Sequence, residues 1–195
     1  MAFQAHIKNK NPKDFIAGWY INPRTCDQLI DFFESNQQHQ IPGVVGDHCT
    51  VDPTIKQSTD LTINEFKDAC VDDYFEQLSH VTEEYKHLYP HCADATGTWG
   101  INLGVQIQRY LPGEGFHKLH CEISEKPQSS RHLVFMTYLN DVTDKGETSW
   151  PHWEVKLQPE KGLTVIWPPA FTHMHQGIAS PSQTKYIVTG WYSHF

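Results

Sequence analysis

Apolar residues recur with helical spacing in the first half of the chain and with strand spacing in the second half. Between residues 63 and 89 an apolar stripe steps by three and four positions and ends at Pro90, which predicts a long helix packed on a core. A shorter helix is predicted over residues 22–38, with Asn22 or Thr25 as its N-cap. The first half is therefore expected to be mainly helical.

From residue 98 onward the pattern changes to period two. In residues 101–110 ("INLGVQIQRY") apolar odd positions alternate with polar or amphipathic even positions, which predicts a strand. Further strands are predicted at residues 14–21, 116–123, 132–140, 162–167 and 184–192, and residues 40–60 are predicted to be an irregular loop. Helices followed by many short strands predict an α+β domain in which helices support a β-sandwich or barrel.

Composition narrows the classes of protein that the chain can represent. A length of 195 residues suits one domain, and no apolar run approaches the ~20 residues that cross a bilayer, so neither a membrane partner nor a secretory signal is expected. The net charge of −8 repels phosphate backbones and argues against a nucleic-acid partner. Five cysteines without a CxxC pair indicate the reducing cytoplasm.

The segment "RYLPGEGFHKLHCEI" holds a candidate pair of metal ligands. On a strand, His120 and Glu122 point to the same side because they are two positions apart. A third ligand can come from "WPPAFTHMHQG", which supplies His173 and His175. Two histidines and one carboxylate form the facial triad of non-haem Fe(II) oxygenases. The pair alone is a weak signal, because 13 histidines make chance pairs common.

Lys185 opens an otherwise apolar strand, "TKYIVTGWY". A buried lysine is costly unless an anion neutralises it, so this position favours an anion-binding pocket. The alternative is an edge lysine whose ammonium group reaches water.

These segments together resemble the Fe(II)/2-oxoglutarate-dependent dioxygenases of the prolyl 4-hydroxylase type. The resemblance runs from about residue 98 to residue 195 through "RYLPGEGFHKLHCE", "HLVFMTYLND", "KGETSW", "KGLTVIWPPAFTHMHQG" and "TKYIVTGWY". It implies a double-stranded β-helix, a jelly-roll barrel, within one domain spanning residues 1–195. Residues 1–97 would then be the mainly helical support, and residues 98–195 the barrel core with the metal site.

The resemblance also implies a role for individual residues. The first metal motif of the family is HxD, and here it is His120-Cys121-Glu122, so glutamate replaces aspartate. The distal histidine of the family lies nine or ten residues before a basic residue that binds the far carboxylate of 2-oxoglutarate. That spacing selects His175, because 185 − 175 = 10, with Lys185 as the basic residue.

Four further residues would contact the cosubstrate or line its pocket by the same resemblance. They are Tyr110, Tyr138, Thr189 and Trp191. Lys185, Thr189 and Trp191 have the same parity along one strand, so all three can face one cavity.

The segment "KGETSWPHW" resembles a turn that shapes the mouth of the site through Gly146 and Thr148. Trp150 and Trp153 in this segment would either stack on a proline-containing substrate or cap the end of the barrel.

The neighbouring histidines and the cysteine have simpler expected roles. His117 is expected to be a loop residue or to support a ligand, since Leu119 and not a carboxylate stands two positions later. His173 is expected to be exposed, with orientation of the substrate as the alternative. His132 is expected to be structural, and Cys121 a small packing residue.

The resemblance implies that the protein uses Fe(II), 2-oxoglutarate and dioxygen, with ascorbate as an optional reductant. The expected activity is hydroxylation of prolyl groups in a peptide or protein. Hydroxylation of a free amino acid or another small molecule is the first alternative, and a cupin-like metal-binding or sensor module without oxygenase activity is the second. The sequence leaves the oligomeric state open.

Overall fold

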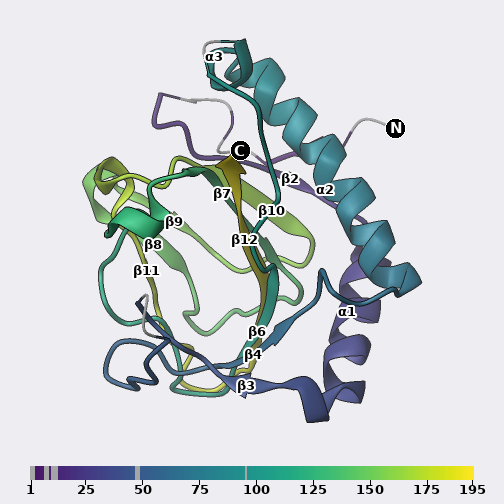
Figure 1. Ribbon diagram of the computed structural model, residues 1–195. Coiled ribbons are helices and arrows are strands. Elements are labelled where there is room, and N and C mark those ends of the chain that lie inside the picture. The colour runs from purple at the N-terminus through teal and green to yellow at the C-terminus, as the bar shows by residue number, and fades with distance from the viewer. Residues whose placement is uncertain (1–2, 7–8, 10–12, 47–48, 95) are drawn as a thin grey trace.

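The computed structural model describes residues 3–6, 9, 13–46, 49–94 and 96–195, so the stretch before residue 13 is covered only in part. The described chain forms three layers (Figure 1). Two helices cover one face of a large antiparallel sheet, and a small three-stranded sheet faces its other side. This is the α+β jelly-roll arrangement that the sequence predicts. None of the described helices is both long and apolar enough to cross a membrane.

The large sheet takes strands from both halves of the chain. Along the sheet they are β1 (Gln4–Ala5), β2 (Ala17–Tyr20), β10 (Leu163–Trp167), β7 (Arg131–Tyr138), β12 (Lys185–His194), β6 (Gln106–Tyr110), β4 (Thr59–Thr62) and β3 (Ile41–Pro42), with β5 (Trp99–Gly100) also paired to β12. The small sheet consists of β11 (Gln176–Gly177), β8 (Thr148–Trp150) and β9 (Val155–Leu157). The first half therefore supplies strands as well as helical support.

The helices begin and end where the local sequence allows. They are α1 (Pro23–Ser35), α2 (Ala69–Leu88), α3 (His91–Asp94) and the short 3-10 turns η2 (Gln37–His39), η3 (Lys126–Gln128), η4 (Pro151–Trp153) and η5 (Phe171–His173). Asn22, not Thr25, caps α1 by accepting from the Arg24 amide. Asp68 caps α2, so this helix begins six residues later than the stripe predicts (69 − 63 = 6).

The helical spacing wrongly predicted that the long helix begins at residue 63, since the segment before Ala69 is not helical. Thr59–Thr62 pair with β6 as strand β4, and the Ile63 amide donates to the Val105 carbonyl. Leu61 and Ile63 are buried in the same core as the helix. The region 40–60 is consequently not only a loop, since β3 and the start of β4 lie within it.

Two predicted strands also needed correction. Strand β6 begins at Gln106 rather than at Ile101. Residues 116–123 form no strand of their own and are held only by isolated bridges, Lys56 with Phe116 and His120 with His175. The bridge at His120 does not continue into a strand, because the backbone amides of Glu122 and Ile123 both donate to the Pro169 carbonyl.

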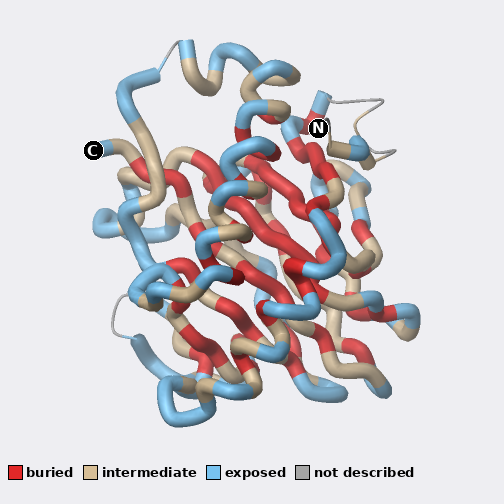
Figure 2. The backbone as a smooth tube through the Cα atoms, turned by 90° about the vertical axis from the view of Figure 1, so that its right-hand side faces the viewer, coloured by how far each residue is buried: buried red, intermediate tan, exposed pale blue. Residues whose placement is uncertain are grey.

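Two apolar cores lie on the two faces of the large sheet. One joins the helices to the sheet, with Tyr74 and Leu78 of α2 packed near Ile107 and Val188. The other fills the barrel between the two sheets and includes Val134, Met136, Trp150, Trp167 and Ile187. Figure 2 shows the buried stretches running through neighbouring strands while the connecting loops are exposed. The barrel core stops short of one end, and a cavity begins there.

Candidate active site

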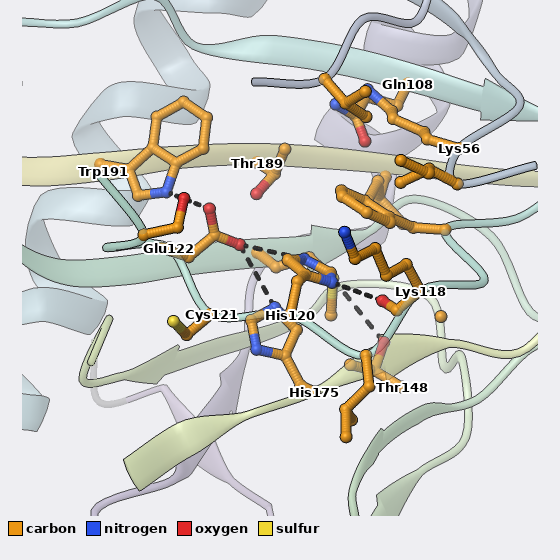
Figure 3. Close-up of a pocket in the computed structure, with 18 of the residues that line it drawn as sticks. Lys56, Gln108, Lys118, His120, Cys121, Glu122, Thr148, His175, Thr189 and Trp191 are labelled. Carbon is orange, nitrogen blue, oxygen red and sulfur yellow. Dashed lines mark hydrogen bonds and ion pairs between the residues drawn. The ribbon is translucent and has the colours of Figure 1, made fainter. Parts of the chain in front are cut away.

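A cavity of about 590 Å³ opens at one end of the barrel. Its walls come from β6, β7, β12, the segment after β6 and the loop between β3 and β4. The volume falls within the range of pockets that hold a small ligand. Figure 3 shows polar side chains gathered along its wall, with one acidic and two imidazole groups turned toward one another.

Those three groups are His120, Glu122 and His175. Their donor atoms all lie within 4.8 Å of one another, and they are the one such group of His, Cys, Asp and Glu among the described residues. Glu122 Oε1 lies 3.4 Å from His120 Nε2 and 3.2 Å from His175 Nε2. The antiparallel bridge between His120 and His175 holds the two backbones side by side through two hydrogen bonds of 2.9 and 2.8 Å.

The hydrogen bonds around both imidazoles determine which nitrogen faces the cavity. Nδ1 of His120 lies 2.8 Å from the Lys118 carbonyl, and Nδ1 of His175 lies 2.9 Å from the His173 carbonyl. A carbonyl only accepts, so each Nδ1 carries a proton and each ring turns its Nε2 toward Glu122. Three atoms that can bind a metal therefore converge on one point.

The spacing fits a divalent metal. Octahedral neighbours bonded about 2.1 Å from a metal lie roughly 3.0 Å apart, close to the two contacts above. Burial by itself raises the pKa of Glu122, but its contacts with His120 and His175 outweigh burial and hold that pKa well below the usual range. The carboxylate is therefore an anion at neutral pH. The set of two imidazoles and one carboxylate suits Fe(II) and leaves coordination positions free for other ligands.

The second oxygen of Glu122 faces away from the histidines. Oε2 accepts from Trp191 Nε1 at 3.0 Å and lies 3.3 Å from a guanidinium nitrogen of Arg131. The sequence pattern gave no role to Arg131, which only precedes an apolar strand.

Lys185 lies in the barrel wall with 4% of its surface exposed. Its ammonium donates to the Gly146 carbonyl at 2.9 Å and lies 5.1 Å from the centre of the Tyr110 ring. Burial lowers the pKa of Lys185 to about 8, partly offset by the negative charge of Glu147. The alternative of an edge lysine that reaches water is excluded, and among the described residues no carboxylate bonds this cation directly.

The other residues expected around the cosubstrate divide into two groups. Tyr110, Thr189 and Trp191 line the cavity together with Lys185. Tyr138 is not among the described lining residues: it is fully buried behind the wall, and its hydroxyl donates to Thr148 Oγ1 at 2.7 Å. Thr148 does line the cavity. Burial raises the pKa of Tyr110 far above the ordinary range, so its hydroxyl stays protonated and donates to Gln108 at 2.7 Å.

Residues of the "KGETSWPHW" segment lie deeper in the fold than expected. At the inner wall of the cavity, the Gly146 carbonyl accepts a hydrogen bond from Lys185, and Thr148 Oγ1 accepts one from the Tyr138 hydroxyl. Trp150 is fully buried and packs edge-on against Trp167, so it is not available to stack on a substrate. Trp153 packs near His173 and is also not among the described lining residues.

The expectation of an exposed His173 is wrong. The residue is 3% exposed, and its Nε2 donates to the Asp14 carbonyl at 2.7 Å. It therefore joins the N-terminal segment to the turn before His175. His117 is exposed in the loop, and His132 bonds the Cys92 carbonyl as a structural residue.

A polar wall formed by residues 56–60 together with Gln108 of β6 was missed by the sequence analysis. Lys56 and Asp60 form a buried ion pair of 2.6 Å, and Ser58 and Gln108 also donate to Asp60. Lys56 and Gln108 line the cavity. The even, polar positions of strand β6 were the available signal for Gln108, whereas Lys56 lies in a segment without periodicity.

Comparison with known proteins agrees with this geometry. Residues 105–193 match the sequence model of the 2OG-Fe(II) oxygenase superfamily. A protein of Acanthamoeba polyphaga mimivirus, named as a candidate prolyl 4-hydroxylase, is 21% identical over 207 aligned positions, which cover 96% of this chain and 77% of the viral protein.

Solved structures share the fold at low sequence identity. A viral collagen prolyl hydroxylase from Paramecium bursaria Chlorella virus-1, solved with 2-oxoglutarate, has a TM-score of 0.70 and 18% identity over 94% of this chain and 98% of its own. A Pseudomonas putida prolyl-4-hydroxylase has a TM-score of 0.72 and 14% identity over 93% and 94%. A Trichoplax adhaerens prolyl hydroxylase, solved with a hypoxia-inducible-factor peptide, has a TM-score of 0.72 and 16% identity over 95% and 86%.

Proposed function

We propose that this chain, a 2-oxoglutarate- and Fe(II)-dependent dioxygenase whose residues 105–193 match that superfamily, hydroxylates prolyl groups in a peptide or protein. The observation that carries the proposal is the pairing of two features in one cavity. A His120–Glu122–His175 triad faces the space, and the buried cation of Lys185 lines the same space.

The residues of the cavity divide the work. His120, Glu122 and His175 would hold Fe(II), which with 2-oxoglutarate and dioxygen supplies the oxidising power that puts a hydroxyl group on a C–H bond. Lys185 would pair with the far carboxylate of 2-oxoglutarate in a charge-assisted hydrogen bond. The buried ammonium favours an anion there, because burial destabilises its charged form and no carboxylate of the described residues bonds it directly.

Apolar side chains of the barrel core line the inner part of the cavity. Trp167 and Met136 line it from the apolar side, and Thr189 lies between Lys185 and Trp191 along one face of β12. The outer part is bordered by the exposed residues Lys118 and Leu119, where a chain could enter. The names of the structurally similar prolyl hydroxylases, one of them solved with a peptide, support a prolyl peptide as substrate.

The experiment has two stages. Anaerobic protein is mixed with Fe(II) and 2-oxoglutarate, and a visible charge-transfer band is expected from the chelated 2-oxo acid. Proline-containing peptides are then added with dioxygen, and mass spectrometry is expected to find a gain of one oxygen on proline together with succinate. Absence of the band at saturating 2-oxoglutarate would favour a metal-binding module instead. Turnover of free proline without turnover of any peptide would replace the peptide substrate with a small molecule.

We also propose that the protein works in the cytoplasm. The support is that all five cysteines are free thiols in the structure, as a reducing compartment favours. Alkylation of thiols during extraction from the native cells, followed by mass spectrometry, tests this, and oxidised pairs would contradict it.

A further inference from the structure

Glutamate at position 122 raises a problem of geometry. Its side chain is one methylene longer than the aspartate of the HxD motif, so it has one more rotatable bond and can place either one or both oxygens on a metal. A carboxylate that binds with both oxygens occupies a position that the reaction needs for another ligand. Some feature of the structure has to restrain the longer side chain.

The contacts of Glu122 Oε2 provide that restraint. A carboxylate oxygen has two lone-pair sites. One is taken by Trp191 Nε1 at 3.0 Å and the other faces Arg131 at 3.3 Å, while Oε1 faces the two histidines (Figure 3 shows the tryptophan contact). Oε2 is therefore engaged on the side away from the metal site.

Arg131 and Trp191 also fix each other. The guanidinium of Arg131 lies 3.8 Å from the centre of the Trp191 ring, a close cation–π stack. The same Arg131 nitrogen that faces Oε2 donates to the backbone carbonyl of Glu122 at 2.7 Å. The three side chains thus form a closed ring of contacts, which we call the Glu122 clamp (Arg131, Trp191 and Glu122).

A β-bulge aims Arg131 into this ring. Trp191 of β12 faces Val134 of β7, but the register shifts one step later, so that Ser193 faces Arg131. Arg131 lies three positions before Val134, and regular alternation would put the two side chains on opposite faces. The extra residue, His132, brings Arg131 to the face shared by Trp191 and Ser193. Bulges that redirect a side chain are common beside active sites.

We propose that Arg131 and Trp191 are positioning residues that hold Glu122 to the metal through Oε1 alone. They do so by occupying Oε2, and thereby let a glutamate serve where an aspartate would need no such restraint. The proposal rests on the proposed function only as far as the metal site.

The test uses Mn(II) as the probe, because its binding is measured without turnover from the EPR signal of the free ion. Trp191→Phe keeps an aromatic ring for Arg131 and deletes the N–H, and Arg131→Met deletes the guanidinium while keeping much of the stem. Each is expected to weaken Mn(II) binding on the order of 10- to 100-fold, the effect typical of removing a partner of a metal ligand.

Arg109→Met is the matched control. Arg109 also pairs with a glutamate, Glu34 at 3.1 Å, and lies 5.5 Å from an aromatic ring, that of Phe33, but it is not among the cavity-lining residues. Its replacement is expected to leave Mn(II) affinity unchanged. Equal loss in Arg109→Met would show a general effect of destabilisation and overturn the proposal.

A coupling experiment separates positioning from a merely structural role. In the Glu122→Asp background the shorter side chain cannot contact the histidines and Trp191 at the same time. Trp191→Phe is therefore expected to add little further loss of Mn(II) affinity. Fully additive losses would overturn the proposal, as would wild-type affinity in both single variants. Failure of the wild-type protein itself to bind Mn(II) would instead contradict the proposed metal site.

Discussion

Replacement of Lys185 by methionine tests the cosubstrate pocket most directly. Methionine keeps much of the apolar stem and deletes the charge. The ammonium donates to the Gly146 carbonyl, and no carboxylate among the described residues forms a direct ion pair with it. The far carboxylate of 2-oxoglutarate would then be buried without a counter-charge.

The structure sets the magnitude of two opposite effects. An ordinary lysine has a pKa of 10.5 and Lys185 about 8, and the difference of 2.5 corresponds to about 3 kcal/mol that burial of the charge costs the folded state at pH 7. Lys185→Met is therefore expected to stabilise the free protein by up to about 3 kcal/mol. Binding of 2-oxoglutarate should weaken by roughly 2–5 kcal/mol, or tens- to thousands-fold.

The pH dependence has a defined sign. Below pH 8 lysine is charged in both the folded and the unfolded state, so the cost of burial is complete. Between pH 8 and 10.5 the unfolded chain keeps its proton and the folded one loses it, so the contribution of Lys185 to stability improves as pH rises. The stability difference between wild type and Lys185→Met should shrink over that interval. Affinity of the wild type for 2-oxoglutarate should fall as pH rises above 8, because the neutral amine attracts an anion less.

The measurements are urea unfolding of the metal-free proteins at pH 7 and 9.5, and anaerobic titration of Fe(II)-loaded protein with 2-oxoglutarate. Fe(II) affinity is the internal control and should change little, because the ammonium is not a ligand. A wild-type affinity for 2-oxoglutarate in Lys185→Met would refute the reasoning and return the metal-binding module to consideration.

Four further variants address the ligands and the wall behind them. His175→Ala is expected to abolish Fe(II) binding, whereas His173→Ala should keep the metal and lose roughly 1–3 kcal/mol of stability with its buried hydrogen bond; the reverse result would identify His173 as the ligand. Glu122→Asp should weaken Fe(II) binding about tenfold or more, since the carboxylate retreats by roughly 1.5 Å from either the histidines or the clamp, and unchanged affinity would show that the extra length is irrelevant. Gly146→Ala should cost roughly 1–3 kcal/mol in urea unfolding, because this residue has a φ of +86° and a new Cβ would lie 2.8 Å from Val142; a neutral effect would contradict the strain.

Several features of this protein were determined by local sequence. The core stripe of α2 and the buried strands of the second half follow from the spacing of apolar residues, which involves neighbours along the chain. Capping chemistry narrowed the N-cap of α1 to Asn22 or Thr25, and the structure selects Asn22. The common face of Lys185, Thr189 and Trp191 follows for the same reason, because alternation within one strand decides it.

Tertiary structure alone decided the features that depend on residues far apart. The pairing of β4 with β6 cannot be read from residues 59–62, because this segment is too short to show a period and its partner strand lies far along the chain. The bridge that joins His120 to His175 replaces the strand predicted at residues 116–123, since single backbone contacts between loops leave no periodic signal.

The inward turn of Arg131 depended on a register shift, which sequence alternation cannot anticipate because one extra residue reverses the face of those beyond it. Burial of Trp150 and His173 likewise came from elements distant in sequence, the β10 strand and the segment at Asp14. Residue types near the motif therefore indicated the chemistry of the metal site. The long-range packing decided which oxygen of Glu122 is available to bind the metal.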